Sequence, residues 1–107
     1  MRIGIDLGGT KIEIAALDEV GSILYRQRIP APRGAYDATV LALQEMVARC
    51  EAETGQSGTI GVGIPGALSK RTGLVKNANS TWLIGRPFKQ DLEAALNHEV
   101  RIQNDAN

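Results

Sequence analysis

The sequence predicts an α/β domain in which a three-stranded antiparallel meander is followed by a helix and parallel strands. Apolar and polar residues alternate with the period of a strand in three early segments, residues 2–7, 11–17 and 22–29. The period then changes to that of a helix at about Asp37, and the alternation returns at residues 59–64. A strand, a helix and a further strand form a crossover connection, which places the two strands parallel to each other.

Glycine-containing turns separate the first three predicted strands. In the first strand the large apolar residues face one side, whereas Gly4 and Asp6 face the other. Gly8 and Gly9 break the alternation and predict a hairpin turn, and residues 18–21 predict a second turn. These three strands are therefore expected to form a meander.

The long helix and the strand after it are predicted from apolar spacing. Apolar residues recur at i, i+3, i+7 and i+10 from Val40 onward, and Gly55 is placed to end the helix. In the following strand, residues 59–64, Gly61 and Gly63 lie on the side away from the apolar residues. These glycines leave room for another segment of backbone to approach the sheet closely.

The remainder of the chain predicts loops, a second helix and a fifth strand. Residues 65–85 are rich in Gly, Asn, Ser and Thr and predict loops, with a short hairpin around residues 70–73. Helical spacing at residues 88–96 predicts the second helix, and residues 100–103 predict the strand. No internal repeat or linker divides the sequence, so we expect one domain.

Composition and charge exclude several classes of protein. The chain has 107 residues, 43% of them hydrophobic, as expected of a folded domain rather than a disordered one. Twelve basic residues balance 12 acidic ones, so no one-signed field favours nucleic acid or an anionic membrane. No apolar run approaches the roughly 20 residues that span a bilayer, and no signal-peptide core follows Met1. The only cysteine, Cys50, and the only histidine, His98, form no disulfide or zinc set, so we expect a cytoplasmic protein.

The turn after the first strand carries residues that can hold a phosphate group. Its order is Gly-Thr-Lys rather than the Gly-Lys-Ser/Thr of a Walker motif, and a strand follows it instead of a helix. Backbone N–H groups of a glycine turn, the Thr10 hydroxyl and the Lys11 ammonium can together bind an anion, while Asp6 can hold Mg²⁺, usually through water. The alternative is a tight hairpin turn with an exposed lysine.

Asp105 follows the fifth predicted strand. If this strand joins the parallel set, Asp105, the turn at residues 63–66 and Asp6 emerge at one edge of the sheet, where ligands of open α/β sheets bind. Two carboxylates there suit phosphoryl transfer, one near the metal and the other accepting the proton of an attacking hydroxyl. The alternatives are a helix N-cap for Asp105 and a plain turn for Gly66.

Residues 77–83 place amides and hydroxyls beside Trp82, a combination that recognises polyhydroxyl ligands such as sugars. The alternative is a polar loop in which Trp82 anchors to the core. Met46 and Cys50 lie on the apolar stripe of the long helix and are expected in the core, whereas His98 is expected at the surface. None of these three is given a chemical role.

Three segments in this order and spacing, residues 3–11, 61–66 and 104–107, resemble the motifs of the ROK family of sugar kinases and repressors. The intervening residues 75–88 look most like the bacterial manno(fructo)kinase branch. The resemblance covers all 107 residues. It implies the actin-like, ribonuclease-H-type ATPase fold, whose opening topology agrees with the predicted order of strands and helix.

The resemblance also implies roles for individual residues. Asp105 would be the base that takes the proton from the sugar hydroxyl, Asn104 would hold the sugar, and Gly66 and Asn79 would lie near it. ATP phosphates and Mg²⁺ would meet the glycine-turn motif, with Asp6 as the metal-binding residue. The members of that motif are Gly4, Asp6, Gly8, Gly9, Thr10 and Lys11.

The implied reaction is ATP-dependent phosphorylation of a hexose, with fructose or mannose favoured, at its hydroxymethyl group. A glucokinase, an N-acetylglucosamine kinase and a non-catalytic sugar-sensing or sugar-binding module are the alternatives. A repressor is disfavoured because the sequence has only Met1 and Arg2 in the place where the repressors carry a helix-turn-helix ahead of the first strand.

Members of the family continue into a second domain with a zinc site, an adenine-side loop and further sugar ligands. We therefore expect residues 1–107 to be a truncated N-terminal lobe that holds half of the cleft and has negligible kinase activity by itself. Any zinc would belong to the second domain. Family analogy also suggests a homodimer.

Overall fold

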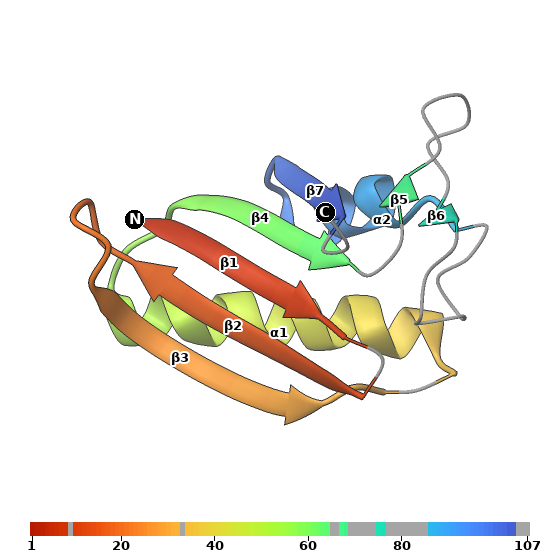
Figure 1. The fold of residues 1–107 in the computed structure, drawn as a ribbon, viewed down its shortest axis with the longest axis horizontal. Helices are drawn as coiled ribbons and strands as arrows, with labels where there is room; N and C mark the ends of the chain where they lie inside the picture. Colours follow the sequence, from red (N-terminus) through yellow and green to blue (C-terminus); the bar gives the residue numbers. More distant parts are fainter. Residues whose placement is uncertain (9, 33, 65–66, 69–74, 77–85, 105–107) are drawn as a thin grey trace.

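The computed structural model describes residues 1–8, 10–32, 34–64, 67–68, 75–76 and 86–104. Its centre is a five-stranded sheet with the strand order β3-β2-β1-β4-β7 (Figure 1). The elements are β1 (Arg2–Leu7), β2 (Lys11–Leu17), β3 (Ile23–Pro30), α1 (Tyr36–Thr54), β4 (Thr59–Ile64), β5 (Ala67–Leu68), β6 (Val75–Lys76), α2 (Phe88–Leu96) and β7 (Val100–Asn104). This order confirms the predicted meander, long helix, parallel strand, second helix and final strand.

Strand β1 is central in the sheet and is paired on both edges. It runs antiparallel to β2 and parallel to β4, and β4 in turn runs parallel to β7. The crossover prediction is therefore confirmed: α1 connects β3 to β4, which lies on the other side of β1 from β2. As a result β1, β4 and β7 all end at the same edge of the sheet (Figure 1).

The core lies between one face of the sheet and the two helices, and α1 runs along this face (Figure 1). Alternate residues of β1, β2 and β4 are buried there, as the sequence pattern predicts. From α1 the buried residues include Met46 and Cys50, which confirms their assignment to the core, whereas His98 is exposed. Each large apolar side chain buried in this way contributes roughly 1.5–3 kcal/mol.

Strand β3 differs in its limits from the predicted residues 22–29. Ser22 belongs to the preceding turn, because its N–H donates to Asp18 Oδ1 at 2.9 Å and its carbonyl accepts from the Asp18 N–H at 3.0 Å. The strand extends instead to Pro30, which pairs with Lys11 at the edge of the sheet, a position that proline tolerates. A shift of register near Leu17 leaves one extra residue in β3.

The predicted hairpin is confirmed by the antiparallel pairing of β5 with β6. Its turn at residues 69–74 lies outside the described residues, as does the polar stretch at 77–85 that includes Trp82.

The predicted end of the long helix is also confirmed. Gly55 has a left-handed φ of 68°, and its N–H donates to the Glu51 carbonyl at 2.9 Å.

Helix α2 is tied to both of its neighbours by side chains. The Tyr36 hydroxyl of α1 donates to Asp91 Oδ2 at 2.6 Å, and the Arg86 guanidinium lies 4.7 Å from the centre of the Tyr36 ring. Burial, together with the bond to Asp91, raises the pKa of the Tyr36 hydroxyl. At the other end of α2, Glu93 Oε2 accepts the Val100 N–H at 2.9 Å, which fixes the start of β7.

Within the described residues, neither helix has the length and apolar character needed to cross a membrane.

Gly58 precedes β4 where the backbone passes close to the first residue of the chain. A Cβ at this position would overlap the carbonyl group of Met1, which also accepts the Thr59 N–H at 3.2 Å. We predict that Gly58→Ala lowers the free energy of unfolding by about 1–3 kcal/mol, because backbone must move to admit the methyl group. Urea unfolding followed by circular dichroism measures this loss.

Gly61→Ala is the matched control for Gly58→Ala. A Cβ at Gly61 would meet no heavy atom within 4 Å in the described part of the chain, and this glycine lies within β4. The control should therefore stay within about 1 kcal/mol of wild type. Equal unfolding midpoints for the two variants would contradict the proposed overlap.

Candidate functional site

Two of the residues that the motifs predict, Asp6 and Asn104, lie at the edge of the sheet where β1, β4 and β7 end. Asp6, near the end of β1, pairs with Gly63 of β4 and is exposed. Ile64, which ends β4, pairs with Asn104, which ends β7. Strand β7 therefore ends at the edge where Asp6 lies, which is the edge where ligands of α/β sheets bind.

The turn between β1 and β2 is closed by backbone hydrogen bonds. The Gly8 N–H donates to the Lys11 carbonyl at 3.0 Å, and a Cβ at Gly8 would lie only 3.1 Å from the same oxygen. The Thr10 carbonyl accepts the Ala31 N–H at 2.9 Å, which joins the turn to the residue after β3. Thr10 and Lys11 are exposed, and the Lys11 ammonium has no ion pair with any described residue.

A small pocket of about 220 Å³ lies beside this turn. It offers two carboxylates, two cations, a hydroxyl and glycine backbone within one concavity. A phosphate group needs N–H, hydroxyl and cationic donors, and a divalent cation needs a carboxylate, so this set suits both ligands. The lining residues are Asp6, Gly8, Thr10, Lys11, Glu13 and Arg28.

Two further predicted site residues, Gly4 and Asn104, are not among the described residues that line this pocket. Gly4 is on β1 and lines a larger groove of about 650 Å³, which crosses the sheet and is also lined by Asp6, Glu13, Gly61 and Arg101. Asn104 is the last residue of β7. Four predicted residues are outside the described ranges, namely Gly9, Gly66, Asn79 and Asp105.

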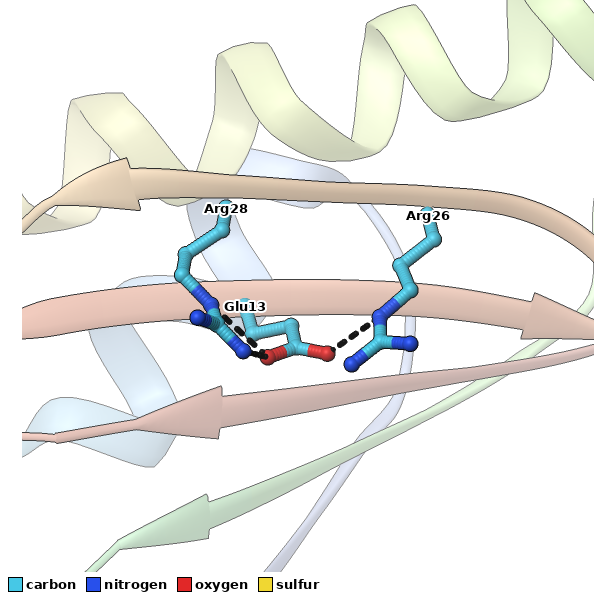
Figure 2. A network of polar contacts seen from close by, with 3 residues as sticks. All are labelled: Glu13, Arg26 and Arg28. Atoms are coloured by element: carbon cyan, nitrogen blue, oxygen red, sulfur yellow. Dashed lines mark hydrogen bonds and ion pairs between the residues drawn. The ribbon is translucent and has the colours of Figure 1, made fainter.

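Two residues of the pocket, Glu13 and Arg28, are given no role by the sequence patterns. Figure 2 shows the Glu13 carboxylate between the guanidinium groups of Arg26 and Arg28. Arg26 Nε donates to Glu13 Oε1 at 2.6 Å, and Arg28 donates to Oε2 from Nε at 3.1 Å and from Nη2 at 2.7 Å. The available signal is the i, i+2 spacing of the two arginines, which places both on the sheet face that carries Glu13.

Arg26 and Arg28 compensate the negative charge of Glu13, which lies opposite Asp6. Asp6 and Glu13 are directly opposite each other on β1 and β2, an arrangement that is unfavourable for like charges. The Arg28 and Arg26 hydrogen bonds hold the pKa of Glu13 below its ordinary value of 4.5, so Glu13 stays ionised with its charge compensated. Among the described residues Asp6 has no such ion pair, which leaves its carboxylate available to a cation.

The donor set fits Mg²⁺ bound together with a phosphate rather than a metal held by protein alone. No group of three or more His, Cys, Asp or Glu side chains comes together among the described residues. Mg²⁺ usually keeps several waters and takes one or two carboxylates plus the phosphates of a substrate. Asp6 supplies one carboxylate to the lining of the pocket, which meets this requirement.

Comparison with known proteins assigns the chain to a family. Residues 2–107 match the model of the ROK family. The chain belongs to the ROK family. It is 38% identical over 107 residues to the N-acetyl-D-glucosamine kinase of Haemophilus influenzae, and the match covers 100% of this chain and 35% of that protein.

Two solved ROK structures share the fold. The ROK hexokinase from Thermus thermophilus superposes with a TM-score of 0.85 at 36% identity, over 98% of this chain and 35% of that one. A ROK family glucokinase from Streptomyces griseus, solved in complex with glucose and AMPPNP, gives 0.83 at 31% identity, over 99% of this chain and 33% of that one. These matches confirm the actin-like ATPase fold. The chain spans about a third of the length of these relatives.

The ion pairs of Glu13 with Arg26 and Arg28 predict that the stability of the fold depends on pH. Because the pKa of Glu13 is lower in the folded chain, its contribution is fully present above the ordinary value of 4.5 and is lost as the pH falls below that value. We predict that Glu13→Gln removes this part of the acid destabilisation. Urea unfolding at pH 7 and at steps from pH 5 to pH 3 measures it.

The control for Glu13→Gln is Glu19→Gln in the exposed turn between β2 and β3, which has no ion pair with the described residues. This variant should keep the acid profile of the wild type. An identical profile for Glu13→Gln would show that the ion pairs with Arg26 and Arg28 add no stability.

Proposed function

We propose that the chain is the N-terminal part of an ATP-dependent hexose kinase. The observation that carries this proposal is the pocket beside the β1–β2 turn, which gathers Asp6, Thr10 and Lys11 at the sheet edge where β4 and β7 also end. Family membership supports it, because the relatives compared above are named as sugar kinases.

The pocket residues would bind the phosphate groups of ATP. The Thr10 hydroxyl would donate a hydrogen bond, and the Lys11 ammonium would supply a positive charge. Asp6 would hold Mg²⁺, directly or through water. When bound, Mg²⁺ neutralises part of the negative charge on the phosphates.

Asp105 is the proposed base. It follows β7, whose last residue lies beside the end of β4. Its carboxylate would accept the proton of the sugar hydroxymethyl group while that oxygen forms a bond to the γ-phosphorus and the bond to ADP breaks. Asn104, Gly66 and Asn79 are proposed as sugar-binding residues.

N-acetylglucosamine and glucose are the first substrates to test, because relatives 38% and 31% identical to this chain carry these sugars in their names. The preference for fructose or mannose expected from the sequence has no such support. Hexoses differ in single hydroxyl or acetamido groups, and a site that hydrogen-bonds such a group discriminates strongly against sugars that lack it. The panel therefore includes all four sugars.

We predict that Asp105→Ala lowers kcat about 10²–10⁴-fold, because general base catalysis is lost, while the sugar Kd stays close to wild type. ADP release with Mg²⁺-ATP and sugar binding by calorimetry measure the two effects. The assay uses the longest polypeptide that the natural reading frame encodes. Asp37→Ala, which removes an exposed carboxylate in the first turn of α1, is the matched control and should keep full turnover.

Two results would contradict this proposal in different ways. Wild-type turnover by Asp105→Ala would reduce Asp105 to a helix cap. A folded wild type that binds a sugar but phosphorylates none of the four would indicate a non-catalytic binding module.

Residues 1–107 by themselves should release ADP no faster than a blank without enzyme. Phosphoryl transfer depends on a site closed to water, and the relatives are about three times as long as this chain. The same coupled assay, run on the 107-residue chain after circular dichroism has shown it to be folded, measures this. A clear sugar-dependent turnover would overturn the proposal that the chain holds only part of the cleft.

A further inference from the structure

We propose that Arg28 is a phosphate-binding residue of the nucleotide pocket and that Glu13 holds its guanidinium in place. The inference rests on the proposed kinase function. It adds a cation from β3 to a site otherwise built from β1, the turn that follows it and the start of β2.

Strand register places Arg28 in the pocket. Arg28 is opposite Glu13 on β2, and Glu13 is opposite Asp6 on β1, so the three residues form one row across the sheet. Neighbouring strands are about 4.8 Å apart, so the backbones of Asp6 and Arg28 are separated by about 10 Å. Both residues line the pocket that also contains Thr10 and Lys11. If Mg²⁺ bound to a nucleotide is held by Asp6, the phosphate groups of that nucleotide lie in the pocket with Arg28 on its opposite side.

Arg28 retains hydrogen-bonding capacity for an anion. An arginine has five N–H donors, and Arg28 directs its Nε and one Nη2 donor to Glu13 Oε2. Its other donors have no partner among the described residues, and its side chain is 53% exposed. The two bonds to one carboxylate oxygen hold the guanidinium in position (Figure 2), so less side-chain freedom is lost when a phosphate binds.

Charge balance gives the same assignment. The pocket contains two carboxylates, Asp6 and Glu13, and two cations, Lys11 and Arg28. Loss of Arg28 would leave a negative excess that repels phosphate. Arg26 also binds Glu13, but through Oε1, and it does not line the pocket. Arg26 is therefore a matched control for Arg28 on the same strand.

Equilibrium binding of Mg²⁺-ATP, Mg²⁺-ADP and adenosine by calorimetry tests the inference in the longest natural polypeptide. We predict that Arg28→Gln raises the Kd of both nucleotides about tenfold, as expected when one charge-assisted contact is lost, and leaves adenosine unchanged. Arg26→Gln should stay within about twofold of wild type, because an exposed pair contributes little. Equal effects of the two variants would overturn the inference.

A double variant separates direct contact from charge balance. Glu13→Gln with Arg28→Gln restores the net charge of the pocket but not the lost donors, so its nucleotide Kd should remain as high as that of Arg28→Gln. A return to wild-type affinity would show that Arg28 only compensates Glu13, and the inference would fail. If Arg28→Gln does not fold, Arg28→Lys is used instead. Because lysine keeps the charge but lacks the planar fork, a nucleotide Kd above that of wild type is expected, and a wild-type Kd would contradict direct contact by the guanidinium.

Failure of the proposed role of Arg28 can be distinguished from failure of the proposed kinase function. A wild type that neither binds nucleotide nor phosphorylates any sugar overturns the proposed function. A wild type that does both, with Arg28→Gln equal to Arg26→Gln, overturns only the role of Arg28.

Discussion

Strand β1 is hydrogen-bonded on both edges, antiparallel to β2 and parallel to β4, and its alternate apolar residues fill the core. Because side chains alternate with a period of two, the register that buries Ile5 and Leu7 also exposes Asp6 between them. A slip by one residue would bury a carboxylate and expose the apolar residues, so the core fixes this register strongly. The position of the candidate site therefore follows from the packing of β1.

The antiparallel and the parallel pairing of β1 each position a different part of the candidate site. The antiparallel pairing with β2 needs only a short turn, and that turn carries Thr10 beside Lys11. The parallel pairing with β4, and of β4 with β7, brings the ends of three strands to one edge. Helix α1 makes this possible by carrying the chain back across the sheet between β3 and β4 (Figure 1). The turn after β1 and the end of β7 then lie at the same edge of the sheet, although more than 90 residues separate them in sequence.

The open face of the sheet carries a row of charges that the core does not determine. Asp6 and Glu13 would repel each other if both were uncompensated, and the arginines of β3 remove this conflict by binding Glu13 (Figure 2). Such exposed ion pairs contribute little to stability individually. Their consequence is local: one carboxylate is neutralised by arginine, and the other is left for a cation. The fold thus gives two carboxylates on neighbouring strands different charge environments.

Periodicity over a few consecutive residues determined the strands, both helices and the end of α1 at Gly55, because apolar spacing and glycine conformation are local properties. The motif residues Asp6, Thr10 and Lys11 were likewise visible in one short segment, and the family resemblance followed from three such segments. The sugar could not be read in this way, since discrimination between hexoses depends on single contacts to the ligand. Only the tertiary structure brought Arg28 to Glu13, 15 residues away, and placed both in the pocket. The contact between Arg28 and Glu13 depends on the register of β2 with β3. The turn between these strands and the extra residue in β3 set this register together, so no single segment of the sequence encodes it.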